Sequence, residues 1–123
     1  MSISRISTPA LGRILNKKVK NPISCFIKFY SNSCPFCVNL KPFFHDVADK
    51  FENEQNHFYA FNISDDPSIA KKLKFKGVPT IVYINTGPSS KIEVLSDPSD
   101  PDEDLFYHPN DILDFVKRNL SDE

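Results

Sequence analysis

Hydrophobic positions near the N-terminus change from a helical to a strand-like pattern. Residues 1–20 carry apolar side chains at the spacing of an amphipathic helix, namely Ile6, Leu11, Ile14 and Leu15. After a break at Asn21-Pro22, residues 23–30 are almost continuously apolar. Such a run is typical of a strand whose two faces are both covered. The pattern therefore predicts an N-terminal helix or extension, and then a buried strand.

A long helix and a second strand are expected next. From Cys37 the apolar positions advance by three or four residues, as on one face of a helix, through Leu40, Phe44, Val47 and Phe51. Pro42 falls inside this run, so we expect a kinked helix rather than a broken one. Residues 58–63 are predicted to form a strand. Asp66-Pro67 is expected to open a short helix, with the aspartate as its cap and the proline in its first turn.

The C-terminal half continues with strands, a loop and a helix. Residues 80–84 and 91–95 are predicted strands, and His108-Pro109 opens a last helix. Residues 96–104 hold five acids and two prolines and are interpreted as a solvated acidic loop. Strands that alternate with helices and end in a hairpin indicate an α/β protein. We expect one domain over residues 1–123, with a mixed sheet of about four to five strands and helices on both faces.

Composition and charge narrow the class of protein. The 123 residues are 40% hydrophobic and carry a formal net charge of −1, which fits an ordinary globular domain with its own core. Basic residues in the N-terminal half are dispersed and the C-terminal half is acidic, so we expect no nucleic-acid partner. No apolar run approaches the ~18 residues of a membrane span, and no secretory signal is visible. We expect a cytoplasmic monomer, although a start without acids leaves a transit peptide as the alternative.

Cys34 and Cys37 are the candidate reactive groups. They are three positions apart, directly after the first predicted strand and at the start of the long helix. Unpaired N–H groups and the helix dipole favour negative charge at such a site, so Cys34 is expected to be a thiolate nucleophile. Cys37, one turn into the helix, is close enough to attack a mixed disulfide on Cys34 and is assigned as the resolving thiol. Pro35 fits the first turn, where an N–H is not needed, and the whole pair indicates redox chemistry.

Two other roles for the cysteine pair remain open. A tetrahedral zinc site needs four ligands, and the other candidates do not repeat the spacing of the pair; these are Cys25, His45, His57 and His108. A permanent structural disulfide is the second alternative, and it fits poorly with a reducing cytosol. We expect no metal and no cofactor. Cys25, in the middle of the first predicted strand, is expected to be a small core residue.

Three separated motifs give the chain its resemblance to the thioredoxin superfamily, which extends over residues 23–120. The first is the strand end Phe29-Tyr30 leading to Cys34-x-x-Cys37, and the second is Lys41-Pro42, which matches the kinking proline of the family. The third, Gly77-Val78-Pro79-Thr80, matches a turn whose proline is cis and faces the cysteines. The resemblance implies a thioredoxin fold and an oxidoreductase for protein disulfides that a disulfide reductase or another dithiol regenerates.

The resemblance also implies how a substrate is bound. A cis bond before Pro79 turns the chain sharply beside the cysteines, which leaves the backbone of Val78 as a short edge for an extended peptide. Pro79 itself places an uncharged side chain without an N–H next to Cys34. Tyr30 is expected to shape the rim of the site, and Phe36 is expected to lie exposed between the cysteines, where both contact the substrate.

Two departures from the family pattern bear on redox behaviour. Pro35-Phe36 between the cysteines resembles a glutaredoxin more than a thioredoxin, although no Gly-Gly follows Pro79 as it does in glutaredoxins. Lys28 stands where the family has a buried acid that is thought to deprotonate the resolving thiol. If Lys28 lies charged near the thiols, it lowers their pKa; the alternative is a side chain that extends to solvent. We therefore expect Lys28 and Pro35 to tune the cysteines toward an oxidising or disulfide-exchanging role.

Together these features favour an oxidoreductase that acts on protein disulfides through a mixed disulfide on Cys34. A glutaredoxin-like enzyme that uses glutathione is the alternative enzyme, and an isomerase-like role lies between the two. The alternative outside the enzymes is a binding module, which uses the thioredoxin-like fold as an interaction surface and does not need its cysteines.

Overall fold

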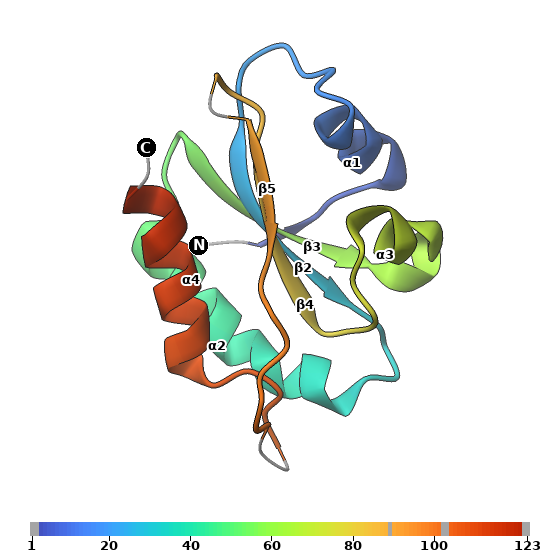
Figure 1. Cartoon of the computed structure of the whole chain (residues 1–123), viewed down its shortest axis with the longest axis vertical. Helices are drawn as coiled ribbons and strands as arrows, with labels where there is room; N and C mark the ends of the chain where they lie inside the picture. The colour runs from blue at the N-terminus through green and yellow to red at the C-terminus, as the bar shows by residue number, and fades with distance from the viewer. Residues whose placement is uncertain (1–2, 89, 102–103, 122–123) are drawn as a thin grey trace.

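A mixed sheet of five strands forms the centre of the molecule (Figure 1). The computed structural model describes residues 3–88, 90–101 and 104–121. The elements in chain order are β1 (Ser4–Arg5), α1 (Thr8–Leu15), β2 (Ser24–Tyr30), α2 (Pro35–Phe51), β3 (Asn56–Asn62), a 3-10 helix (Ile63–Asp65), α3 (Ser68–Leu73), β4 (Thr80–Asn85), β5 (Lys91–Val94) and α4 (Pro109–Ser121). The strand order across the sheet is β1-β3-β2-β4-β5. β3 runs parallel to β1 and β2, and β4 runs antiparallel to β2 and β5.

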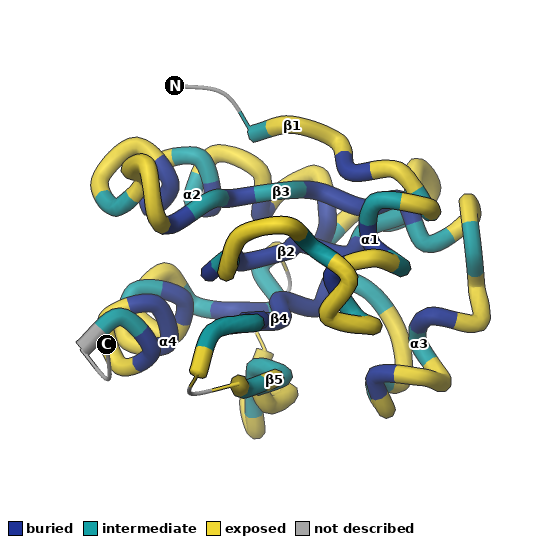
Figure 2. Tube along the Cα trace, turned by 90° about the horizontal axis from the view of Figure 1, so that it is seen from above, coloured by how far each residue is buried: buried dark blue, intermediate teal, exposed yellow. Residues whose placement is uncertain are grey.

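Helices cover both faces of the sheet, as the alternating pattern predicts. α2 and α4 lie on one face, and α1 and α3 lie on the other (Figures 1 and 2). Alternate residues of β2 enter two separate cores: Phe26 packs with α2 and α4, whereas Cys25, Ile27 and Phe29 pack with α1 and α3. Because both of its faces are covered, β2 is apolar almost throughout, and Figure 2 shows buried residues along it between the helices.

The long helix begins earlier than its apolar spacing indicates. α2 starts at Pro35 with Cys34 as its N-cap, because a proline in the first turn lacks only an N–H that has no partner there. Pro42 lies inside α2, and the helix continues through it to Phe51. The expectation of an unbroken helix is therefore confirmed. Its buried face consists of Cys37, Leu40, Phe44, Val47 and Ala48.

β1 is a strand that no sequence pattern predicts. It pairs with β3, and both of its residues are exposed and leave no apolar signal.

α3 spans Ser68–Leu73 and so begins one residue after the predicted start at Pro67. Pro67 itself has helical backbone angles, φ −61° and ψ −20°. The Oδ1 of Asp66 accepts the N–H of Ser68 at 3.2 Å and the hydroxyl of Ser68 at 2.6 Å. These contacts are those of an aspartate that caps a helix with a proline in its first turn, as predicted.

The acidic segment is a loop where the structure describes it. Residues 96–101 form neither helix nor strand and are mostly exposed, whereas residues 102–103 lie outside the described residues, as do residues 1–2 of the N-terminal extension. At the far end of the loop, the carbonyl of Asp104 accepts a 2.8 Å hydrogen bond from the side-chain amide of Asn39. This bond holds the loop against α2. Among the described residues, no helix combines the length and the apolar character needed to cross a membrane.

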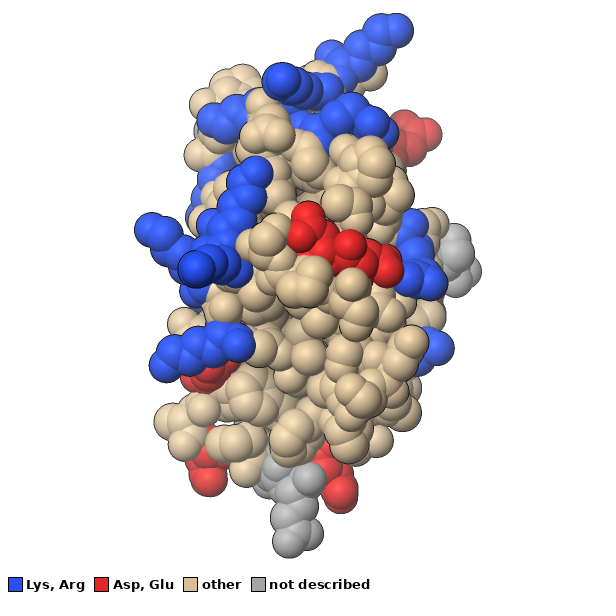
Figure 3. Space-filling view, turned by 90° about the vertical axis from the view of Figure 1, so that its right-hand side faces the viewer, with Lys and Arg blue, Asp and Glu red and all other residues tan. Residues whose placement is uncertain are grey.

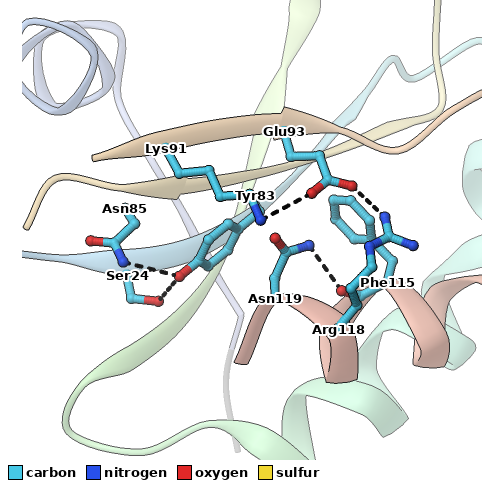
Figure 4. Close-up of polar contacts among 8 residues, drawn as sticks. All are labelled: Ser24, Tyr83, Asn85, Lys91, Glu93, Phe115, Arg118 and Asn119. Carbon is cyan, nitrogen blue, oxygen red and sulfur yellow. Dashed lines mark hydrogen bonds and ion pairs between the residues drawn. The ribbon is translucent and has the colours of Figure 1, made fainter. Parts of the chain in front are cut away.

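Polar contacts attach the C-terminal helix to the edge of the sheet (Figure 4). Glu93 of β5 forms ion pairs with Lys91, at 3.3 Å, and with Arg118 of α4. Exposed ion pairs contribute little to stability, so the pair of Glu93 with Arg118 orients α4, and the apolar core beneath it supplies most of the attachment.

A separate group of hydrogen bonds joins β2 to β4. The hydroxyl of Tyr83 lies 3.1 Å from the hydroxyl of Ser24 and 3.3 Å from the side-chain amide of Asn85.

Candidate active site

Cys34 and Cys37 lie where β2 ends and α2 begins. A short turn at residues 31–33 leads from the strand to Cys34, which caps α2, and Cys37 lies in the first turn of the helix. The two Cα atoms are 5.2 Å apart and the two sulfurs form a disulfide. Cys37 is 4% exposed, whereas Cys34 is only half-buried. The outer sulfur is therefore the one that a second molecule can reach.

The start of α2 favours negative charge on Cys34. The backbone N–H of Cys37 donates to the Sγ of Cys34 at 3.0 Å, so the sulfur occupies the position of an N-cap acceptor. A thiolate at this position gains a hydrogen bond and the favourable field of the helix dipole. This is the arrangement expected from the sequence for a reactive outer cysteine.

The turn that precedes β4 lies directly beside Cys34. The Val78–Pro79 bond is cis, as the motif implies, and the carbonyl oxygen of Val78 is 3.8 Å from the Sγ of Cys34. Val78 is half-buried and Pro79 is buried. The hydroxyl of Thr80 donates to the carbonyl of Gly77 at 2.6 Å and closes the turn. Because β4 pairs with β2, the register of the sheet brings this turn and the cysteines to the same end of the molecule.

The aromatic residues near the cysteines differ from expectation in one respect. Tyr30 is half-buried and lines a pocket together with Cys37. Phe36 is half-buried rather than exposed between the cysteines, because its ring packs near that of Phe106, with centroids 5.9 Å apart. Phe106 is a neighbour of the site that the sequence does not reveal. An apolar residue soon after a polar loop is its one sequence feature, and this feature does not indicate which part of the fold the loop contacts.

Lys28 is buried and does not extend to solvent. The residue is 6% exposed, and its Nζ lies over the rings of Tyr30 and Phe44, 5.5 and 5.7 Å from their centroids. Burial, and then the charge of Lys41, lowers the pKa of Lys28 from 10.5 to about 8. Lys28 and Cys37 line the same pocket. Of the two alternatives for Lys28, the side chain that extends to solvent is therefore excluded.

Lys28→Met is expected to change how stability depends on pH. Between pH 8 and 10.5 the folded chain has lost the Lys28 proton and the unfolded chain still carries it. Unfolding then takes up a proton, so Lys28 makes the free energy of unfolding rise with pH in this window, by roughly 2–3 kcal/mol. Denaturant unfolding of the two oxidised proteins from pH 7 to 10.5 should show this extra rise only with lysine. Identical curves would mean that the ammonium is well solvated in the folded chain.

Cys25 is a core residue, as expected from its place in β2. It is fully buried, and burial raises the pKa of its thiol to about 12, so the thiol stays protonated near neutral pH. At high pH, the raised pKa of this thiol makes the free energy of unfolding fall as pH rises, which is opposite to the effect of Lys28. Because Cys25 is present in both wild type and Lys28→Met, its effect cancels when the two proteins are compared.

His45 lies on α2 and is half-buried in the pocket that contains Cys37. Burial, and then the charges of Lys28 and Lys41, lowers the pKa of His45 below its ordinary 6.5, which favours the neutral imidazole. Across residues 3–88, 90–101 and 104–121, no group of three or more His, Cys, Asp or Glu side chains is arranged to hold a metal ion.

Two kinds of similarity connect the sequence with known proteins. The thioredoxin family profile matches residues 12–103, well over half of the chain. The chain is 31% identical over 68 residues to a thioredoxin of Borreliella burgdorferi, which covers 55% of this chain and 57% of that protein. It is 28% identical over 67 residues to protein disulfide-isomerase 1 of Caenorhabditis elegans, which covers 53% of this chain and 14% of that protein. The chain thus spans little more than half of the first relative and a small part of the second.

Solved structures show the same fold. Mitochondrial thioredoxin 3 from Saccharomyces cerevisiae, in its oxidised form, aligns with a TM-score of 0.68 at 19% identity and covers 94% of each chain. The thioredoxin fold that the motifs imply, a mixed sheet with helices on both faces, is thereby confirmed. The family match includes the Cys-x-x-Cys pair, whose two sulfurs are at disulfide distance. On this combined ground of sequence, fold and paired cysteines, the chain belongs to the thioredoxin family.

Proposed function

We propose that this protein is a thiol–disulfide oxidoreductase that reduces or exchanges disulfides in other proteins. The observation that carries the proposal is the disulfide-bonded pair itself, with Cys34 accessible at the N-cap of α2 and Cys37 behind it. In the reduced chain, the Cys34 thiolate attacks one sulfur of a substrate disulfide, forms a mixed disulfide and releases the other sulfur as a thiolate. Cys37 then loses its proton, attacks the Cys34 sulfur and expels the second substrate thiolate. Two electrons pass from the dithiol to the substrate, and a disulfide reductase or another dithiol returns them.

In this proposal the substrate lies across the turn beside Cys34. The backbone of Val78 pairs with an extended peptide, and Pro79 supplies an apolar wall without an N–H; the 3.8 Å separation of the Val78 carbonyl from the Cys34 Sγ supports this position. Tyr30 and Phe36 border the opening. On the face that carries α1 and α3, Lys and Arg gather over the upper part, while the lower part, toward the start of α2, is largely uncharged (Figure 3). An uncharged approach suits a protein partner of varied sequence.

Lys28 is proposed to shift the cysteine pair toward an oxidising or disulfide-exchanging role. Lys28 lines the same pocket as Cys37, and a nearby positive charge stabilises a thiolate. Stabilising the reduced form raises the reduction potential of the couple. Pro35, between the cysteines, is proposed to act in the same direction.

Lys28→Met is expected to lower the reduction potential of the Cys34–Cys37 couple by about 10–30 mV, because a neutral side chain no longer stabilises the thiolate. Lys50→Met, which removes an exposed lysine from the last turn of α2, is the matched control and should leave the potential unchanged. Equilibration with glutathione buffers of known potential measures all three proteins. A wild-type potential at or below about −270 mV would refute the oxidising shift.

The proposed activity is tested by reduction of insulin with dithiothreitol as the electron donor. Catalytic amounts of the protein should accelerate insulin reduction well above the rate with dithiothreitol alone. A glutathione-coupled assay with a small mixed disulfide is the second arm, and a higher activity there would make the protein glutaredoxin-like instead. Refolding of a scrambled disulfide substrate would reveal an isomerase-like role.

The proposal includes the setting in which the protein works. A cysteine pair that cycles between dithiol and disulfide suits a reducing compartment, so we place it in the cytoplasm, as a monomer with a single domain over residues 1–123 and without a metal or organic cofactor. A sheet with one core on each face supports the single domain. Equilibrium sedimentation tests the monomer, and fractionation of cells with an antibody to the chain tests the compartment.

A further inference from the structure

A pocket of about 430 Å³ lies beside Cys37, between α2 and the strands β1, β2 and β3. Its volume is within the range of small-molecule sites in proteins. Val78 and Pro79 do not line it, so it is separate from the surface proposed for the peptide. Its lining residues are Ile3, Arg5, Lys28, Tyr30, Ser31, Asn32, Cys37, Val38, Lys41, His45 and Ala60. Four of these are basic by type and none is acidic.

The positive charge of this pocket is poorly compensated by the protein. Within the described residues, neither Lys28 nor Lys41 forms an ion pair, and Lys28 is 6% exposed with only aromatic rings over its ammonium. Burying an unpaired ammonium is unfavourable. Arg5 does have a partner, since its guanidinium lies 3.2 Å from the carboxylate of Asp65.

Besides Asp65, which pairs with Arg5, two acidic side chains of α2 act on a residue that lines the pocket. Asp46 and Asp49 act on His45 less strongly than Lys28 and Lys41 do, and both aspartates are exposed, so solvent screens them. Lys28 and Lys41 therefore give the pocket a net positive character. An anion inside it would pair with both ammonium groups, and the imidazole of His45 would be available as a hydrogen-bond donor.

We propose that this pocket binds a small organic anion with two or three carboxylate or phosphate charges, held by Lys28 and Lys41. The fit rests on the volume of the pocket, on a lining without acids and on a buried ammonium that the described part of the chain leaves unpaired. A bound anion would supply the partner that Lys28 lacks. It would enter beside the inner cysteine and leave the accessible face of Cys34 open to protein substrates.

The bound anion is coupled to the redox state of the cysteines, and this part of the inference rests on the proposed function. In the proposed function Lys28 also stabilises the negative charge of the reduced pair, whereas the disulfide carries no charge. The anion and the thiolate therefore compete for the same ammonium, so the anion binds more tightly to the oxidised protein. By reciprocity of linkage, the anion lowers the reduction potential of the couple.

Calorimetric titration of the oxidised protein with citrate at pH 7, in sodium chloride of constant ionic strength, tests the pocket directly. We expect saturable binding at one site, and at least a tenfold loss of affinity in Lys28→Met and in Lys41→Met. Lys50→Met, on the same helix but outside the pocket, should bind like wild type. Inorganic phosphate in a parallel titration shows whether one compact anion is enough. Lys41 is exposed, so its variant keeps the test valid if Lys28→Met folds poorly.

The Cys34→Ser/Cys37→Ser double variant separates this inference from the proposed function. It cannot exchange disulfides, yet it retains Lys28 and Lys41 and should bind citrate like the oxidised wild type. Citrate binding by a wild-type protein that fails to reduce insulin would support the pocket and refute the activity. Absence of saturable binding of both anions, or equal affinity in wild type, Lys28→Met and Lys41→Met, would overturn the pocket whatever the activity.

Discussion

Cys34→Ser is expected to reduce insulin turnover to the rate with dithiothreitol alone, whereas Cys37→Ser should react once and then accumulate as a mixed disulfide. Without the Sγ of Cys34, no bond to the substrate forms. Without Cys37, nothing within the chain attacks that bond, and only dithiothreitol releases the substrate slowly. Turnover measures the loss in both variants. Mass spectrometry after exposure to a disulfide peptide separates them, because only Cys37→Ser should carry the added peptide.

Cys25→Ala is the matched control for the two serine variants. Its thiol is fully buried and belongs to the core under α1 and α3, so its removal should leave turnover unchanged. Equal turnover in wild type, Cys34→Ser and Cys37→Ser would contradict the enzyme proposal. If a partner protein still bound when both cysteines were serine, the chain would be a binding module with a thioredoxin fold.

Phe26→Ala is expected to lower the free energy of unfolding by about 3–5 kcal/mol. The side chain is fully buried, and its ring lies 5.1 Å from Phe58 of β3, 4.8 Å from Tyr83 of β4 and 5.9 Å from Phe115 of α4. Removing it leaves a cavity where the centre of the sheet meets the C-terminal helix. The loss is a large part of the total stability of a domain this size. Chemical denaturation of the oxidised protein measures it.

Val38→Ala is the control for the core variant. Val38 is 62% exposed on α2, and a surface substitution of this kind changes stability by less than about 0.5 kcal/mol. Equal stability of Phe26→Ala and Val38→Ala would mean that the aromatic cluster around Phe26 does not hold α4 to the sheet.

The elements with buried faces could be predicted from the sequence because burial leaves a pattern. β2 is covered on both faces, so its sequence is an almost continuous apolar run. α2 is covered on one face and repeats apolar residues at helical spacing. β1 has no such pattern: its two residues are exposed and belong to the sheet only through backbone pairing with β3. The start of α3, by contrast, follows from its residue types, because an aspartate followed by a proline is typical of a helix N-terminus.

The residues of the candidate site likewise fall into two groups, those that local motifs predict and those that depend on tertiary packing. Cys34 and the Val78–Pro79 turn follow from short motifs whose local geometry is nearly fixed by residue type. The burial of Lys28 cannot be predicted from a short motif. A lysine in a strand is buried or exposed according to which element covers its face of the sheet. Here Lys28 lies on the face of β2 that α2 covers, over Phe44. The contact of Phe36 with Phe106 depends likewise on how a distant loop folds back.

The pH dependence of Cys34 alkylation tests the central claim, a stabilised thiolate at the start of α2, most directly. The Cys37→Ser variant is the suitable protein, because it retains the backbone N–H at position 37 and leaves Cys34 as the accessible thiol; the remaining cysteine, Cys25, is fully buried. We predict that the rate with iodoacetamide rises with an inflection below the value of about 8.5 for a free cysteine, and that reaction is fast at pH 7. An inflection at or above that value, with slow reaction at neutral pH, would contradict the claim.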